Sequence, residues 1–204
     1  DHPLPVVDCF AAPCTAACPV HQQVPEYIRL ATAGREQAAI DTIVADIPLP
    51  RITGVLCDHV CMNHCARLDY EGPVAIRDVK LACSRAAAPR VHPPAALAGP
   101  AVAIIGAGPA GLSCAWHLGL AGVHCVIFDR EPAIAGVVAN VIPPFRISRA
   151  DIASDVDRIK ALGVEFRLGQ PISGPEDLLS AVIQPDQGFS DTFLATGAWI
   201  PRPL

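Results

Sequence analysis

The sequence predicts an α-helical domain followed by an α/β domain of the Rossmann-like type. In the first part, six of the nine cysteines fall into two blocks that flank a helical hydrophobic pattern. In the second part, a short apolar run at residues 101–105 enters a glycine-rich turn that opens a helix. Residues 86–100, between these parts, are rich in Ala and Pro and have no periodicity. We therefore expect a helical domain at residues 1–95 and a Rossmann-like domain at residues 96–204.

The composition is that of a globular protein. The 204 residues, 51% hydrophobic and 17% charged, suffice for two small domains. A net charge of -5, without a basic stripe, argues against direct nucleic-acid binding. No apolar stretch reaches the roughly 20 residues of a membrane span, and the N-terminus lacks the basic region of a signal peptide. We expect a cytoplasmic protein whose odd number of cysteines serves metal or redox ligation, since stable disulfides are rare there.

The two cysteine blocks are the strongest metal signal. Their members are Cys9, Cys14, Cys18, Cys57, Cys61 and Cys65. Thiolates are the usual ligands of iron-sulfur clusters, and a cysteine followed by proline, here Cys18 and Pro19, recurs in cluster-binding segments. Two other interpretations stay open: a zinc site that includes His59 or His64, and cysteines buried as small apolar residues. The structural interpretation is favoured for the isolated Cys83, Cys114 and Cys125.

Two helices are expected between the blocks. The first runs from Pro25 to about Ala33. The second carries apolar residues at i, i+3, i+4 and i+7 starting from Ile40, and Pro48 and Pro50 end it. A helical hairpin of this kind returns the chain, so it can bring the two cysteine blocks together.

The glycine-rich turn has the G-x-G-x-x-G spacing of a dinucleotide site. Gly106 permits a tight turn, Gly108 lets the backbone approach a pyrophosphate, and Gly111 lets the helix pack against the strand. Pro109 fits because the first helical turn needs no N–H from it. The helix N-terminus then faces the phosphates with unpaired N–H groups.

Residues further along complete this site. The strand predicted at residues 123–128 ends at Asp129, close to the separation expected for a carboxylate that binds ribose hydroxyls. The long connection at residues 131–148 is a candidate ligand-covering loop. Thr196 and Gly197 follow directly on a strand, which suggests close approach of the backbone to the ligand.

The remaining elements follow from local patterns. We expect helices from Gly72 to about Arg85, from a Ser148 cap to Leu162, and briefly from Pro175. Strands are expected at residues 164–168 and 189–195.

These residues resemble a known family. The segments CTAACPVHQQVPEYIRLATAGR, PLPRITGVLCDHVCMNHCARLDYEGPVAIRDVK, VAIIGAGPAGL, IPPFRI and FLATGAWIPRPL are similar, in this order, to the flavin and iron-sulfur module of the glutamate synthase small subunit and dihydropyrimidine dehydrogenase. The second cysteine block is most similar to that of an iron-sulfur subunit assigned to selenate reduction. The resemblance covers about residues 9 to 204. It implies a helical domain with two 4Fe-4S clusters and an FAD domain that an NAD(P)H domain interrupts.

The resemblance also implies a set of site residues. One cluster would be held by Cys9, Cys14 and Cys65, and the other by Cys18, Cys57 and Cys61. The implied FAD-binding residues are Gly106, Gly108, Pro109, Ala110, Gly111, Asp129, Arg130, Gly136, Val137, Arg146, Thr196 and Gly197. Ile142, Pro143 and Arg146 would lie on the loop that flanks the isoalloxazine.

Three residues depart from the family pattern. Val6 stands where the first cluster commonly has another cysteine. Lys80 stands where these relatives have a carboxylate or amide ligand, which a protonated amine cannot replace. Cys83 lies one helical turn after Lys80 and is a candidate substitute. Ala135 replaces the first of two glycines, leaving Gly136.

The implied function is that of an electron-transfer oxidoreductase, in which electrons pass between NAD(P)H, FAD and 4Fe-4S clusters to a partner subunit or domain. The cofactors would carry the chemistry, since no residue has the pattern of a catalytic acid, base or nucleophile. The alternatives are a non-catalytic scaffold with a zinc or structural cysteine domain and no flavin, and a Rossmann domain that binds NAD. Because Leu204 follows the ATGA motif so closely, without a second G-x-G-x-x-G, we expect this chain to be a fragment of a longer protein, which would bind the NAD(P)H.

Overall fold

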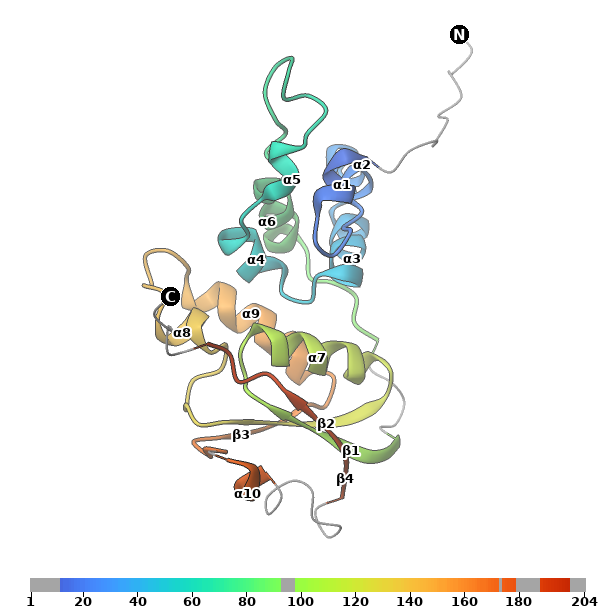
Figure 1. Ribbon diagram of the computed structural model, residues 1–204. Coiled ribbons are helices and arrows are strands. Elements are labelled where there is room, and N and C mark those ends of the chain that lie inside the picture. Colours follow the sequence, from blue (N-terminus) through green and yellow to red (C-terminus); the bar gives the residue numbers. More distant parts are fainter. Residues whose placement is uncertain (1–11, 93–97, 173, 179–187, 199–204) are drawn as a thin grey trace. The chain divides into compact units, whose positions relative to one another are not determined.

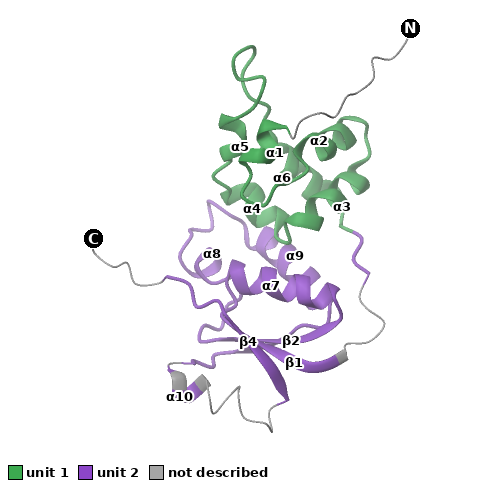
Figure 2. Cartoon of the chain, turned by 45° about the vertical axis from the view of Figure 1, so that its right-hand side comes forward, with its two compact units in different colours: residues 1–89 green, residues 90–204 purple. Residues whose placement is uncertain are grey.

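The computed structural model describes residues 12–92, 98–172, 174–178 and 188–198. The chain divides into two compact units, Asp1–Pro89 and Arg90–Leu204 (Figure 2). The domain boundary predicted near residue 95 falls in residues 93–97, outside the described residues, so those limits stay a prediction.

The described residues of unit 1 are helical, in agreement with the predicted class (Figure 1). The helices are α1 (Pro13–Ala17), α2 (Val24–Thr32), α3 (Glu36–Asp46), α4 (Pro50–Leu56), α5 (Val60–Asn63) and α6 (Ile76–Ala86).

The predicted helical hairpin is formed by α2 and α3. Their buried faces contribute Tyr27, Leu30, Ile40 and Ile43 to the core of unit 1. This packing supplies most of the stability of such short helices, since isolated helices of this length are marginal in water.

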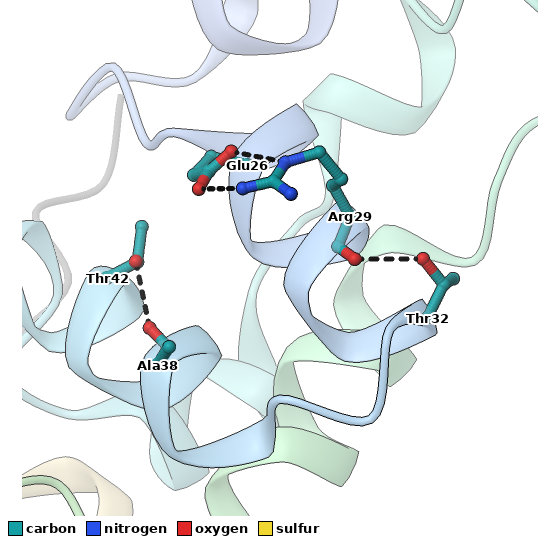
Figure 3. Close-up of polar contacts among 5 residues, drawn as sticks. All are labelled: Glu26, Arg29, Thr32, Ala38 and Thr42. Atoms are coloured by element: carbon teal, nitrogen blue, oxygen red, sulfur yellow. Dashed lines mark hydrogen bonds and ion pairs between the residues drawn. The ribbon is translucent and has the colours of Figure 1, made fainter.

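Side chains of α2 and α3 make polar contacts within their own helices (Figure 3). The Arg29 guanidinium donates to both carboxylate oxygens of Glu26, at 2.9 and 2.7 Å. The Thr32 hydroxyl donates to the carbonyl of Arg29, and the Thr42 hydroxyl to the carbonyl of Ala38. The Glu26–Arg29 pair is exposed and contributes little to stability.

Three short helices of unit 1 were not predicted from the sequence, namely α1, α4 and α5. The helix predicted to end before Pro48 does end there, since α3 stops at Asp46. Pro50 then begins α4, because proline is accommodated in a first helical turn that needs no N–H from it. The helix expected from Gly72 begins only at Ile76, since Gly72 has a φ of +100° that is incompatible with a helix.

Unit 2 contains a four-stranded parallel sheet in the order β3-β2-β1-β4. The strands are β1 (Ala98–Ile105), β2 (Val123–Asp129), β3 (Glu165–Leu168) and β4 (Phe189–Leu194). The predicted linker is wrong at its end, because Ala98 pairs with Val123 as the first residue of β1.

Helices connect these strands, as expected for the α/β class. They are α7 (Pro109–Leu120), α8 (Val137–Asn140), α9 (Arg149–Lys160) and α10 (Pro175–Leu178). Both α7 and α9 lie on one side of the sheet (Figures 1 and 2). The predicted long connection at residues 131–148 contains α8. None of the described helices is long and apolar enough to cross a membrane.

Candidate functional site

The glycine turn between β1 and α7 brings three parts of unit 2 into close contact. Gly106 has a φ of +117°, and its N–H donates to the carbonyl of Phe128 at 2.7 Å. A Cβ on Gly106 would lie 2.3 Å from the carbonyl oxygen of Ala195, which directly follows β4. A Cβ on Gly111 would lie 1.9 Å from the carbonyl oxygen of Gly106. Both positions therefore need glycine for the fold itself.

Gly108 differs from the two other glycines of the motif, Gly106 and Gly111. A Cβ placed there would meet no protein atom within 4 Å, and its φ of -76° suits any residue. The open space beside Gly108 belongs to a cavity of about 660 Å³. The fold does not require glycine at this position, whereas close approach of a ligand to the backbone does.

Asp129 at the end of β2 stabilises the turn by hydrogen bonds to the backbone. Its Oδ2 accepts a hydrogen bond from the backbone N–H of Ala107 at 2.6 Å, and its Oδ1 accepts one from that of Glu131 at 2.8 Å. Asp129 also lines the cavity. A carboxylate has about four lone-pair sites, so two bonds to the backbone leave it capacity to accept from a ligand hydroxyl.

The covering loop is anchored on the same turn. The N–H of Ala135 donates to the carbonyl of Ala107 at 2.9 Å, and a Cβ on Gly136 would lie 3.0 Å from the Cα of Gly108. Ala135 is fully buried with a φ of +91°, a conformation that favours glycine. The residue that departs from the family pattern therefore still makes the loop contact, at the cost of backbone strain.

The cavity lies where the carboxyl ends of the parallel strands meet. The structure places ten of the predicted FAD-binding residues along it. They are Gly106, Gly108, Pro109, Ala110, Asp129, Arg130, Gly136, Val137, Thr196 and Gly197. Gly111 lies beneath the turn instead, and Arg146 is exposed on the loop and does not line the cavity.

Sequence reasoning missed other lining residues. They are Ile105, Phe128, Gln170, Pro171, Ile172, Leu194 and Ala195. Each lies at or just beyond the carboxyl end of a strand, and the Gln170 N–H donates to the Asp129 carbonyl at 2.9 Å. Applying the strand-end rule to the predicted third strand would have found Gln170 and its neighbours.

The cavity suits a dinucleotide. Its volume lies within the range of roughly 300–1,000 Å³ of small-molecule sites. The 12-residue helix α7 begins at it, so helix N–H groups and the positive end of the helix dipole are available to a pyrophosphate. The open approach at Gly108 and the carboxylate of Asp129 fit the pyrophosphate and ribose of FAD.

Unit 1 contains the second candidate site. Cys14 lies in α1, Cys18 directly follows α1, Cys57 caps the end of α4, and Cys61 lies in α5. All of these cysteines, and Cys65, are partly buried and free. Cys9 lies outside the described residues, so its role stays a prediction.

Three of these cysteines line one small hollow of about 30 Å³. Cys18, Cys57 and Cys61 come from separate segments and meet there beside the buried side chains of Tyr27 and Lys80. These are the three cysteines that the resemblance assigns to one cluster. Cys14 and Cys65 do not line this hollow, but they are close enough to each other to interact electrostatically.

Burial shifts the pKa values of two residues at this hollow, Cys61 and Lys80. It raises the pKa of Cys61, and the neighbouring Cys57 and Cys18 raise it further, whereas Lys80 opposes the shift. Burial likewise lowers the pKa of Lys80, against the attraction of the three thiolates. Metal binding must therefore displace a proton from the Cys61 thiol.

The donor set fits an iron-sulfur cluster better than a zinc ion. Within the described ranges, no three His, Cys, Asp or Glu side chains converge closely enough to hold a single metal ion. The His64 Nδ1 pairs with the carbonyl of Val60 at 3.1 Å, and the His59 Nδ1 lies against that of Asp58. A cluster spaces its thiolates more widely, because iron and sulfide atoms lie between them.

Two family models match the chain. Residues 6–89 match the 4Fe-4S cluster family described as dihydropyrimidine dehydrogenase domain II, and residues 104–151 match a NAD(P)-binding Rossmann-like domain. The two matches fall on units 1 and 2, respectively.

Several curated proteins are similar over nearly the whole chain. The "Putative oxidoreductase YgfK" of Escherichia coli K12 is 40% identical over 95% of the chain, which covers 19% of that protein. The NADPH-Fe(3+) oxidoreductase subunit beta of Geobacter sulfurreducens is 36% identical over 97% of the chain, covering 30% of that subunit. The glutamate synthase [NADPH] small chain of Mycobacterium tuberculosis is 32% identical over 97%, covering 41%. The chain thus spans less than half of the length of these relatives.

The order of the domains and the placement of both sites agree with these similarities. Residues 6–89 are thus similar to a 4Fe-4S domain of the dihydropyrimidine dehydrogenase type and residues 104–151 to a NAD(P)-binding Rossmann-like domain, and nearly the whole chain is similar to oxidoreductases that are more than twice as long.

Proposed function

We propose that this chain is the electron-transfer segment of a larger NAD(P)H oxidoreductase, with FAD in unit 2 and iron-sulfur clusters in unit 1. The observation that carries the proposal is the presence of two prepared sites in one chain. Cys18, Cys57 and Cys61 gather at one hollow, and a dinucleotide cavity opens beside Gly108.

The residues of unit 2 hold and orient the flavin nucleotide. The backbone at Gly108 and the start of α7 receive the pyrophosphate, and Asp129 accepts from the adenosine ribose. Thr196 and Gly197 after β4, with Gly136 and Val137 of the covering loop, bound the cavity on its other sides. FAD is preferred to NAD because the G-A-G-P-A-G turn is combined here with a later Ala-Thr-Gly.

The cysteines of unit 1 hold the clusters. Cys18, Cys57 and Cys61 serve one cluster, while Cys14 and Cys65, together with Cys9, serve the other. The buried ring of Tyr27 lies close to Cys14, Cys18 and Cys61, members of both sets. When bound, FAD accepts an electron pair as hydride and the clusters accept single electrons.

We assign the binding of the electron donor and of the electron acceptor to other parts of a longer protein and its partner. Relatives named as subunits of NADPH-Fe(3+) oxidoreductase and NADP(+)-dependent formate dehydrogenase support an electron-accepting partner subunit. NAD(P)H would be bound by parts of the protein beyond these residues. Thiolate ligands need a reducing compartment, so we place the protein in the cytoplasm.

Cofactor analysis tests this function. The protein is prepared anaerobically, reconstituted with iron, sulfide and FAD, and analysed for iron, acid-labile sulfide and flavin. We expect all three, with electron paramagnetic resonance signals on reduction by dithionite. Zinc at stoichiometric level without sulfide, or no retained flavin, would contradict the proposal.

A further inference from the structure

Lys80 is a buried cation in an unusual position. It lies on α6, is only 4% exposed, and lines the same small hollow as Cys18, Cys57 and Cys61. Lysine is almost never fully buried unless its charge is paired. Its burial beside three thiols therefore needs a physical reason.

Among the described residues no carboxylate compensates this cation, and the groups of opposite charge that interact with it are the sulfurs of Cys18, Cys57 and Cys61. No hydrogen bond or ion pair joins the Lys80 ammonium to any residue in ranges 12–92, 98–172, 174–178 and 188–198, and no carboxylate lines the hollow. Arg77, one turn earlier on α6, also lines the hollow, and its Nη1 donates to the Cys57 carbonyl at 3.3 Å. An uncompensated buried ammonium is costly, so negative charge is expected in the hollow when the protein is loaded.

The charge of an iron-sulfur cluster provides this compensation. Three thiolates on a dipositive four-iron core leave one net negative charge, which the Lys80 ammonium neutralises. Arg77 has its own counter-charge in Asp78, whose Oδ1 lies 3.9 Å from the Arg77 Nε. Four thiolates would leave two. No fourth cysteine lines the hollow among the described residues, so the charge balance and the number of thiols agree.

We propose that Cys18, Cys57 and Cys61 bind their cluster through three thiolates alone, and that Lys80 is the buried counter-charge in place of a fourth ligand. One iron would then be left to a water molecule, which adds no charge. Net charge is one determinant of cluster potential, so Lys80 also makes this cluster easier to reduce. The inference rests on the proposed function, since it requires a cluster in unit 1.

His59 is the competing fourth ligand. Its side chain lines the hollow, and its Nδ1 lies against the Asp58 carbonyl, which leaves Nε2 as a potential donor to iron. The experiment must therefore separate Lys80 from His59.

The first measurement counts open iron sites. A cluster with three thiolate ligands loses its fourth iron on mild oxidation by ferricyanide and shows the paramagnetic signal of a three-iron cluster. We expect Lys80→Cys, which adds a fourth thiolate, to reduce this signal. Lys160→Cys is the matched control, since Lys160 is half-exposed on α9 in unit 2. His59→Ala should leave the signal of the wild-type protein unchanged.

The second measurement is the reduction potential. Lys80→Met keeps the side-chain length and removes the charge, and an uncharged side chain in a buried position should not impair folding. We expect it to lower the reduction equilibrium constant at least about tenfold, or about 59 mV for a one-electron couple. Lys160→Met should leave the potential unchanged.

Each result of these measurements either supports or overturns the proposal for Lys80. An undiminished three-iron signal in Lys80→Cys, an increased signal in His59→Ala, or an unchanged potential in Lys80→Met would overturn the proposal while leaving the proposed function intact. A protein that retains no iron and sulfide would overturn both.

Discussion

Gly108 and Gly111 stand three residues apart in one turn, yet they serve different purposes. A Cβ on Gly111 would collide with the Gly106 carbonyl oxygen at 1.9 Å, whereas one on Gly108 would project into open space. The same motif thus contains a glycine that the fold requires and one that only a ligand requires. Single substitutions can separate folding from binding at this site.

Gly108→Ala should weaken FAD binding without unfolding the protein. The added methyl group would occupy the space beside the backbone where the pyrophosphate approaches, so we expect the Kd for FAD to rise at least about tenfold, or about 1.4 kcal/mol. The free energy of unfolding should change by less than about 1 kcal/mol. Flavin fluorescence titration and chemical denaturation measure the two quantities.

Gly174→Ala is the matched control. Gly174 also precedes a proline that begins a helix, and a Cβ on it would meet no atom within 4 Å, but it does not line the cavity. Equal losses of FAD affinity in the two variants would show that Gly108 has no special role in binding.

At the scale of the element, α9 shows how local capping supports the fold under the site. The Ser148 hydroxyl accepts from the N–H of Asp151 at 3.1 Å and donates to its carboxylate at 2.8 Å. Further along α9, the buried carboxylate of Asp155 accepts from Arg158 at 2.7 Å. Ile152, Val156 and Ile159 form the buried apolar face.

Ser148→Ala should destabilise unit 2. The substitution removes the side-chain acceptor for a helix N–H, which costs about 1 kcal/mol of the free energy of unfolding. Denaturation followed by tryptophan fluorescence reports on unit 2, because both tryptophans, Trp116 and Trp199, belong to it. Ser113→Ala is the control: the Ser113 hydroxyl donates only to the Pro109 carbonyl inside α7, so its removal should cost less than about 0.5 kcal/mol. A loss as large in Ser113→Ala would argue against the cap.

At the scale of the molecule, the two units have separate cores and separate sites. The core of unit 1 includes Tyr27 and Ile40, and that of unit 2 includes Ile104 and Trp116. Because neither site draws on described residues of the other unit, cofactor loading should be independent in the two.

Two variants test this independence. Cys57→Ser should lose the iron and sulfide of one cluster but retain FAD, since Cys57 lies only at the hollow of unit 1. Gly108→Ala should lose FAD but retain iron and sulfide. Cys114→Ser, at an isolated cysteine in α7, should retain both. Loss of FAD in Cys57→Ser would show that the units do not load separately.

Local patterns predicted much of the fold. The helices around Tyr27 and Ile40, the strand-turn-helix at Gly106 and the helix capped by Ser148 all follow from periodicity and capping residues that lie close together in the sequence. The four-residue α5 and the short helix begun by Pro50 could not be predicted in this way, because too few residues repeat to produce a period.

The sequence by itself determined two kinds of chemistry, namely dinucleotide binding and metal ligation. The spacing of Gly106, Gly108 and Gly111 indicated a dinucleotide turn, and the two cysteine blocks indicated metal ligation, because both signals depend on residue type and short-range spacing. Only the tertiary structure decided that Cys18, Cys57 and Cys61 meet at one hollow, that Lys80 is buried beside them, and that Gln170 and Ala195 reach the dinucleotide cavity. These are contacts between segments far apart in the chain, created by helix packing in unit 1 and parallel strand pairing in unit 2, and no local period encodes them.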